Sequence, residues 1–113
     1  MTKYLISFDD GSMDHVPEAD FPAVGEAAHA VLREAKAAGV FITGGGLYRQ
    51  QASYVGTDGT VTPGPVPETK AVLGGFVVVD VPTRDDALGW AAKWAVACRC
   101  TQEVREIMDD PEV

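Results

Sequence analysis

Hydrophobic residues recur along this chain with two different periods, and these periods predict its strands and helices. Short runs rich in β-branched and aromatic residues indicate strands, which we expect over residues 2–8, 40–43, 76–81 and 101–108. Apolar residues spaced three and four apart indicate helices, which we expect over residues 21–38 and from residue 83 to about 97. The predicted order is strand, helix, strand, strand, helix, strand.

Two further short strands are predicted between the second and third of these strands. Residues 51–56 and 59–62 lie on either side of Asp58-Gly59, a dipeptide that tolerates the positive φ angles of a tight turn. Three prolines follow between positions 63 and 67, and proline cannot donate a hydrogen bond inside a sheet. We therefore expect an inserted hairpin that reaches over a pocket or onto a partner, followed by a stiff loop.

The order of the six main elements is that of the ferredoxin-like, split βαβ fold. Right-handed crossovers place both helices on one face of a four-stranded antiparallel sheet. The segment FVVVDV at 76–81 is apolar on both faces, so we expect a partner to cover the face without helices. The prediction is a single α+β, ferredoxin-like βαββαβ domain over residues 1–113, with an inserted β-hairpin, forming a homodimer through its sheets.

Composition excludes several classes of partner. The chain of 113 residues is long enough for one domain that buries roughly two thirds of its unfolded surface. Its net charge of −8 argues against nucleic acid and anionic membrane surfaces, because both are polyanions. No apolar run approaches the ~20 residues of a membrane span, and the first strand lacks the pattern of a signal peptide. We expect a cytoplasmic protein.

No metal site and no cofactor are predicted. Cys98 and Cys100 form a C-x-C pair, which is too few ligands for zinc without a second pair elsewhere. Asp10, Ser12 and Asp14 could offer oxygen ligands, but the bidentate glutamate of a calcium loop is missing. Two reduced cysteines near a helix end and a solvated acidic loop are the expected alternatives.

His29 is the candidate for acid–base chemistry. On a helical wheel it lies roughly 120° from the centre of the apolar stripe, at an edge that can meet a cleft or water. A neutral imidazole suits general-base work when a carboxylate orients it. Its helical neighbours Glu26 and Arg33 do not plainly perform that task. A solvated surface histidine is the alternative interpretation.

Four further residues are candidates for ligand contacts. Glu68 and Lys70 lie in the proline-rich segment, where they would form a surface ion pair of small value or present an acid and an ammonium group to a ligand. In the second case Tyr48 and Arg105 would lie beside that ligand. The sequence leaves both interpretations open.

Five blocks of the sequence resemble the DGPF branch of the YCII-related family. They are KYLISF near the N-terminus, AAGVFITGGGL at 37–47, GPVPETKAVLGGF at 64–76, DVPTRDDALGWA at 80–91 and EVREIM at 103–108. The resemblance implies a ferredoxin-like fold assembled as a dimeric α/β barrel, with a His–Asp pair proposed as catalytic in several members. His29 lies close to the place of that histidine, whereas Lys93-Trp94 occupies the place of the acid.

Two functions fit these observations. The protein is either an enzyme that performs lyase-type or isomerase-type acid–base chemistry on a small molecule, or a module that only binds such a molecule. In the enzyme, His29 accepts a proton while Lys70 or Arg105 steadies an anion. The enzyme requires a buried His29 with an acid within hydrogen-bond reach, and the binding module requires a closed pocket without such a pair.

Overall fold

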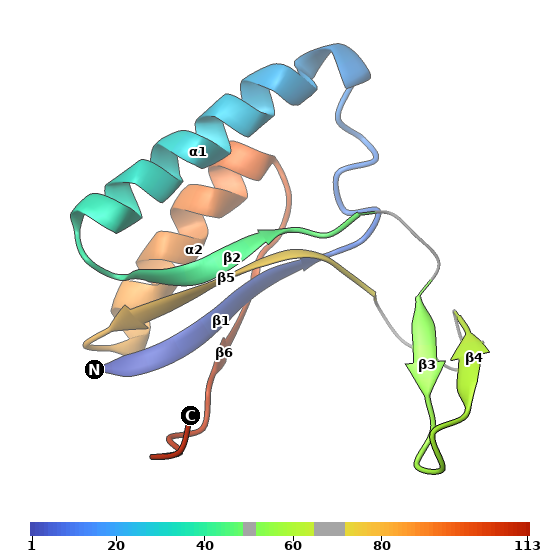
Figure 1. Cartoon of the computed structure of the whole chain (residues 1–113). Coiled ribbons are helices and arrows are strands. Elements are labelled where there is room, and N and C mark those ends of the chain that lie inside the picture. Colours follow the sequence, from blue (N-terminus) through green and yellow to red (C-terminus); the bar gives the residue numbers. More distant parts are fainter. Residues whose placement is uncertain (49–51, 65–71) are drawn as a thin grey trace.

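The computed structural model describes residues 1–48, 52–64 and 72–113, and it has a mixed α/β architecture (Figure 1). Two helices, a four-stranded antiparallel sheet and a separate two-stranded sheet make up this part of the chain. The elements follow in the order β1 (Thr2–Asp9), the 3-10 helix η1 (Glu18–Asp20), α1 (Phe21–Ala37), β2 (Phe41–Gly46), β3 (Ser53–Val55), β4 (Val61–Pro63), β5 (Leu73–Val81), α2 (Arg84–Cys98) and β6 (Glu103–Glu106).

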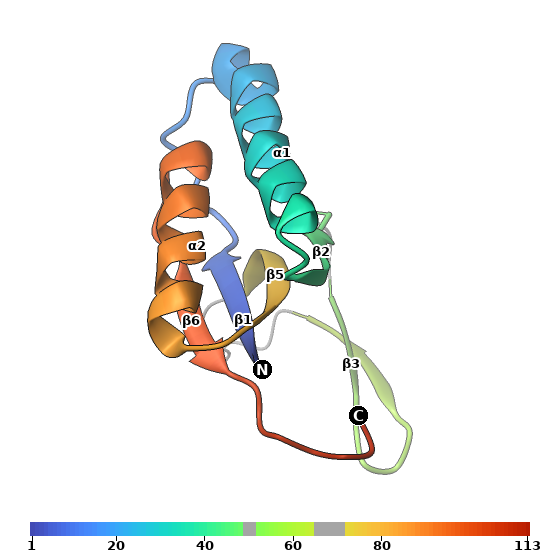
Figure 2. The same ribbon diagram turned by 90° about the vertical axis from the view of Figure 1, so that its left-hand side faces the viewer.

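The main sheet is open, with strand order β2-β5-β1-β6, so β2 and β6 form its edges. Figures 1 and 2 show α1 and α2 side by side over the same face of this sheet. Tyr4 lies directly opposite Val79, and both point to the helices. Their neighbours Leu5 and Val78 are also opposite each other and, by strand alternation, point to the face without helices.

Both predicted helices are confirmed, with ends that differ by one residue from the expected ones. The start of α2 shows why its position could be predicted. The Thr83 hydroxyl accepts a hydrogen bond from the Asp86 N–H at 3.1 Å, and the Asp86 carboxylate accepts one from the Thr83 N–H at 3.2 Å. This reciprocal capping box satisfies backbone donors that the first turn leaves free. Neither helix among the described residues has the length and apolarity needed to cross a membrane.

Aspartate is one of the residue types that most often cap the start of a helix. Asp20 does precede α1, but its side chain makes no capping hydrogen bond. Instead its carboxylate accepts a hydrogen bond from Arg99 Nη1 at 2.8 Å. The charged guanidinium is the stronger partner for a carboxylate, and the contact links the start of α1 to the end of α2.

Two strands are longer than expected because glycines lie inside them. β2 continues through Gly44–Gly46 and β5 begins before Gly74-Gly75, whereas the expected strands ended at residue 43 and began at residue 76. At Gly75 the reason is a close approach, since a Cβ atom there would lie 2.7 Å from Cε1 of Phe8. Glycine therefore admits the Phe8 ring to the surface of the sheet.

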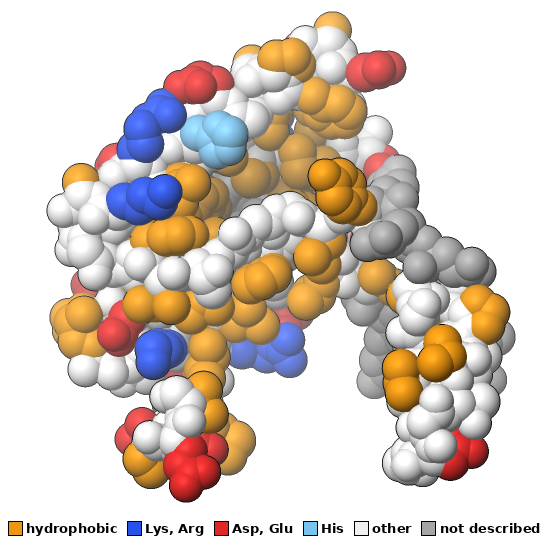
Figure 3. Space-filling model, viewed as in Figure 1, with side chains coloured by type: hydrophobic (Ala, Val, Ile, Leu, Met, Phe, Trp, Pro, Cys, Tyr) orange, Lys and Arg blue, Asp and Glu red, His pale blue; other side chains and the backbone are white. Residues whose placement is uncertain are grey.

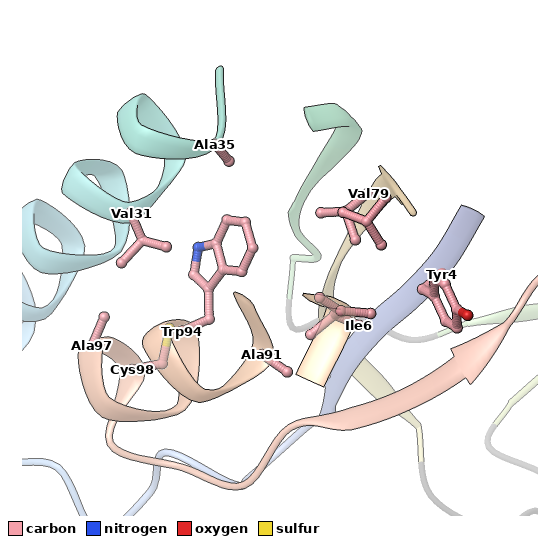
Figure 4. Packing of buried hydrophobic residues seen from close by; sticks show 11 residues of the cluster. Tyr4, Ile6, Val31, Ala35, Val79, Ala91, Trp94, Ala97 and Cys98 are labelled. Carbon is pink, nitrogen blue, oxygen red and sulfur yellow. The ribbon is translucent and has the colours of Figure 1, made fainter. Parts of the chain in front are cut away.

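The core lies between α2, the second half of α1 and the two central strands (Figure 4). Ile6 and Val79 reach it from the sheet, Trp94 and Ala91 from α2, and Ala35 from α1. Leu88 of α2 is 43% exposed, because the buried face of this helix is formed by alanines, Trp94 and Cys98.

The predicted hairpin is confirmed as the two short strands β3 and β4. Ser53 pairs with Pro63 and Val55 pairs with Val61, and Gly59 takes a φ of 85° in the connecting turn. Figures 1 and 2 show the hairpin extending away from the helices. Among the described residues β3 and β4 pack on each other and on no other helix or strand, so the hairpin does not cover a pocket of its own chain.

Candidate ligand-binding hollow

A hollow of about 340 Å³ lies between α1 and the sheet. Its walls come from α1, α2, β1, β2 and β5, together with the loop that follows β1. Figure 3 shows hydrophobic side chains gathered in the recess between the upper helix and the sheet. Its large apolar side chains include Phe8, Met13, Phe21, Phe41 and Trp94. We call this space the hollow.

Small residues keep the hollow open. Gly25 and Ala28 face it from α1, and the glycine run 44–46 faces it from β2. A Cβ atom on Gly25 or on Gly46 would meet no other atom within 4 Å, so each could carry a side chain without a clash. At Gly44, in contrast, a Cβ atom would lie 2.8 Å from Cγ1 of Val77. The hollow is therefore open at Gly46 because glycine is small, and not because the backbone at this position excludes a larger residue.

Four of the lining residues have side chains that can form hydrogen bonds, and they are His29, Trp94, Cys98 and Gln102. No aspartate, glutamate, lysine or arginine of the described chain lines it. Gln102 uses its Nε2 group to donate a weak hydrogen bond to Cys100 Sγ at 3.6 Å. Such a lining, largely apolar with a few polar groups, is typical of sites for small molecules.

Cys98 contributes a neutral thiol to this lining. Burial raises the pKa of its thiol from the ordinary value of 9.0 to about 11, and the nearby Cys100 adds a smaller increase. Burial likewise raises the pKa of the Cys100 thiol. Both cysteines are free. Because the thiolate is the nucleophilic form, Cys98 is a weak hydrogen-bonding group at neutral pH and not an activated nucleophile.

His29 lies on the lining, at an exposed position of α1. Its imidazole has no hydrogen-bond partner among the described residues. Glu26, the acid closest to it along the helix, accepts a hydrogen bond from Arg33 Nη2 at 2.6 Å. In the part of the chain that the structure describes, His29 therefore lacks the orienting carboxylate that general-base catalysis requires.

The other predicted site residues do not join His29. Tyr48 follows the edge strand β2 and is 89% exposed. Arg105 lies on β6 at the opposite edge of the sheet, where its Nε atom is 2.9 Å from Glu103 Oε1. It pairs across the sheet with Leu5, on the face without helices. Glu68 and Lys70 lie outside the described residues, so their roles stay predictions.

Sequence reasoning missed Lys36 and the aromatic lining. The Lys36 ammonium lies 5.7 Å from the centroid of the Phe41 ring, which borders the hollow. Lys36 follows His29 by two turns of α1, so helical spacing could have placed it on the same edge. Phe8, Phe21 and Phe41 come from three different elements, and no local pattern connects them.

The described residues show no metal centre. Within 1–48, 52–64 and 72–113, no three His, Cys, Asp or Glu side chains come together in a group that could hold a metal ion. The acidic residues that follow β1 therefore do not form such a group. The chemistry available at the hollow is that of apolar contact and hydrogen bonding.

Comparison with known proteins places the chain in a family. The family model described as YCII-related domain matches residues 7–110. A search of curated proteins found no match. The family match includes both helices and all of the main sheet except the first residues of β1. It also includes every residue of the hollow's lining other than Ile6. The chain belongs to the YCII-related family.

Proposed function

We propose that this protein binds a small organic molecule in the hollow between α1 and the sheet. The observation that carries the proposal is an apolar space of about 340 Å³ beside a closely packed core. Protein interiors contain few voids larger than a water molecule, and pockets for ligands begin at roughly 300 Å³. The large side chains around the hollow thus leave apolar surface that a ligand would cover.

Acid–base turnover of the bound molecule is a second candidate function. It is favoured by one observation, the position of the His29 imidazole on the lining. We rank binding first because the described residues give His29 no carboxylate partner. Replacing His29 with Gln separates the two, since Gln keeps a hydrogen-bonding group but cannot accept a proton at neutral pH. Binding that persists in His29→Gln while turnover disappears would favour the enzyme.

We also propose the finer assignment of the fold, a ferredoxin-like domain of the DGPF branch that forms a homodimeric α/β barrel. The strand order β2-β5-β1-β6, with both helices on one face, supports it. Half-buried Leu5, Phe76 and Val78 on the other face support a partner there. Sedimentation velocity at micromolar concentration tests the dimer. A monomer would contradict the barrel and leave the hollow in place, because one chain supplies its whole lining.

Filling the hollow is the direct test of the binding function. Gly46 lies opposite Gly75, which by strand alternation shares the helix-facing side of β5 with Val77 and Val79. A side chain at position 46 therefore enters the hollow. A ligand from a metabolite panel should raise the melting temperature of the native protein, because a ligand that binds only the folded state stabilises it. Gly46→Leu should abolish this rise.

Gly45 supplies the matched control. Gly45 also borders the hollow, but it lies opposite Phe76, so a side chain added at position 45 points to the face without helices, and its Cβ atom would also meet nothing within 4 Å. Gly45→Leu should keep the ligand-induced shift. Equal shifts in the native protein and both variants would contradict binding in the hollow.

A further inference from the structure

We propose that the molecule held in the hollow is an apolar anion, with its hydrophobic part inside the hollow and its acidic group at the rim beside the Lys36 ammonium. This inference rests on the proposed binding function and names the class of ligand. It assigns to Lys36 the role that the sequence suggested for Lys70 or Arg105.

The position of Lys36 carries the first step. Its Nζ atom lies 5.7 Å from the centroid of the Phe41 ring, and that ring is part of the lining. Phe41 thus has the hollow on one side and a cation beside it. Figure 3 shows Lys and Arg side chains on the side of the molecule to which the recess opens. A ligand that fills the space against Phe41 comes within reach of this charge.

Lys36 is also available, whereas three other cations on or directly after the helices are paired. Arg33, Lys93 and Arg99 each pair with a carboxylate, those of Glu26, Glu34 and Asp20 respectively. Within the described residues Lys36 has the contact with Phe41 and no carboxylate partner. An unpaired ammonium stands out in a chain with a net charge of −8. A compact ammonium group attracts carboxylates and other anions as a point charge.

The interior of the hollow explains why the acidic group would stay at the rim. Its hydrogen-bonding side chains are those of His29, Trp94, Cys98 and Gln102, and no lining residue of the described chain is a lysine or an arginine. An unpaired charge buried there would lose its hydration without compensation. At the rim, water and Lys36 both reach the charge. An amphiphilic anion therefore matches the two environments, whereas a cation would be repelled by Lys36.

The test uses two fluorescent probes with the same ring system. N-phenylnaphthylamine is neutral, and its sulfonate, anilinonaphthalene sulfonate, is an anion. We expect Lys36→Gln to weaken binding of the sulfonate about 3- to 5-fold, the upper part of the range for one partly exposed ion pair, and to change binding of the neutral amine less than about 2-fold. Added salt should weaken the sulfonate alone, because mobile ions screen the exposed charge.

Lys93 provides the matched control, since its Nζ atom lies 5.8 Å from the centroid of the Trp90 ring, and Trp90, unlike Phe41, does not border the hollow. Lys93→Gln should leave both affinities unchanged. If Gly46→Leu blocks both probes while Lys36→Gln affects neither, the assignment of an anionic ligand is overturned and the binding function stands. If Gly46→Leu blocks neither probe, the binding function is overturned and this inference with it.

Discussion

The space between the helices and the sheet is filled in one half and hollow in the other. In the filled half, α2 packs on β1, β5 and β6, and alanines and valines such as Ala87 and Val79 are fully buried in one cluster. In the hollow half, glycines of β2, the first turns of α1 and the residues Phe8 and Phe41 surround open space. Both halves are apolar. What differs is the fit of facing side chains, so hydrophobicity alone does not mark the site.

Removing a large side chain at the boundary between the halves should have the largest effect. Ile6 is 0% exposed and borders both the core and the hollow. Ile6→Ala should lower the free energy of unfolding by about 2–5 kcal/mol, because the transfer of the methyl groups is lost and a cavity is left. Urea denaturation measures this. Val96→Ala, at an 80% exposed position of α2, should stay within about 0.5 kcal/mol of the native value.

Adding volume should separate the two halves most clearly. Ala87→Leu places extra methyl groups in the filled half and should cost about 1–3 kcal/mol, since overpacking forces strain. Gly46→Leu adds a side chain to the hollow half, where no atom lies within 4 Å of its Cβ position. It should change the unfolding free energy by less than about 1 kcal/mol. Similar losses in the two variants would mean that the hollow is not open in solution.

The filled half could be predicted from the sequence far better than the hollow could. Helix spacing and the Thr83-Asp86 capping box are local signals, and they located both helices to within a residue. Short runs rich in β-branched and aromatic residues placed β1 and most of β5. The glycine runs were misjudged because their role depends on partners distant in sequence, such as Phe8 over Gly75.

The site depends still more on such distant partners. The His29 edge of α1 was visible on a helical wheel, and His29 does lie on the lining. The rings that complete the hollow come from β1, α1 and β2, so only the assembled sheet brings them together. Lys36 carried no special signal until Phe41 was placed beside it. A cavity is an absence of packing, and no residue pattern encodes it directly.

A smaller effect should come from the cap of the filled half. Thr83→Ala removes the hydroxyl that accepts the Asp86 N–H and should cost about 1 kcal/mol. Because this cap lies at the start of α2, away from the lining, affinity for the neutral probe should not change. Thermal denaturation and a fluorescence titration measure the two quantities. A loss of affinity without a loss of stability would show that the two halves are coupled.

The smallest effect should appear in alkaline solution. Burial raises the pKa of the Cys98 thiol from 9.0 to about 11, so the unfolded chain loses this proton at a lower pH than the folded chain. Stability from Cys98 is therefore complete below pH 9 and declines as the pH rises from 9 towards 11. Cys98→Ala should remove this part of the decline. The pKa of Tyr4, raised first by burial and then by Glu106, adds a decline that remains in the variant.

Methionine methyl NMR tests the central claim, a ligand site in the hollow, most directly. The chain has three methionines, of which Met13 borders the hollow, whereas Met1 and Met108 are exposed and distant from it. On titration with N-phenylnaphthylamine we predict a saturable shift of the Met13 methyl resonance, no shift of the other two, and loss of the Met13 shift in Gly46→Leu. An unmoved Met13 resonance, or equal shifts of all three methyl groups, would contradict a ligand site between α1 and the sheet.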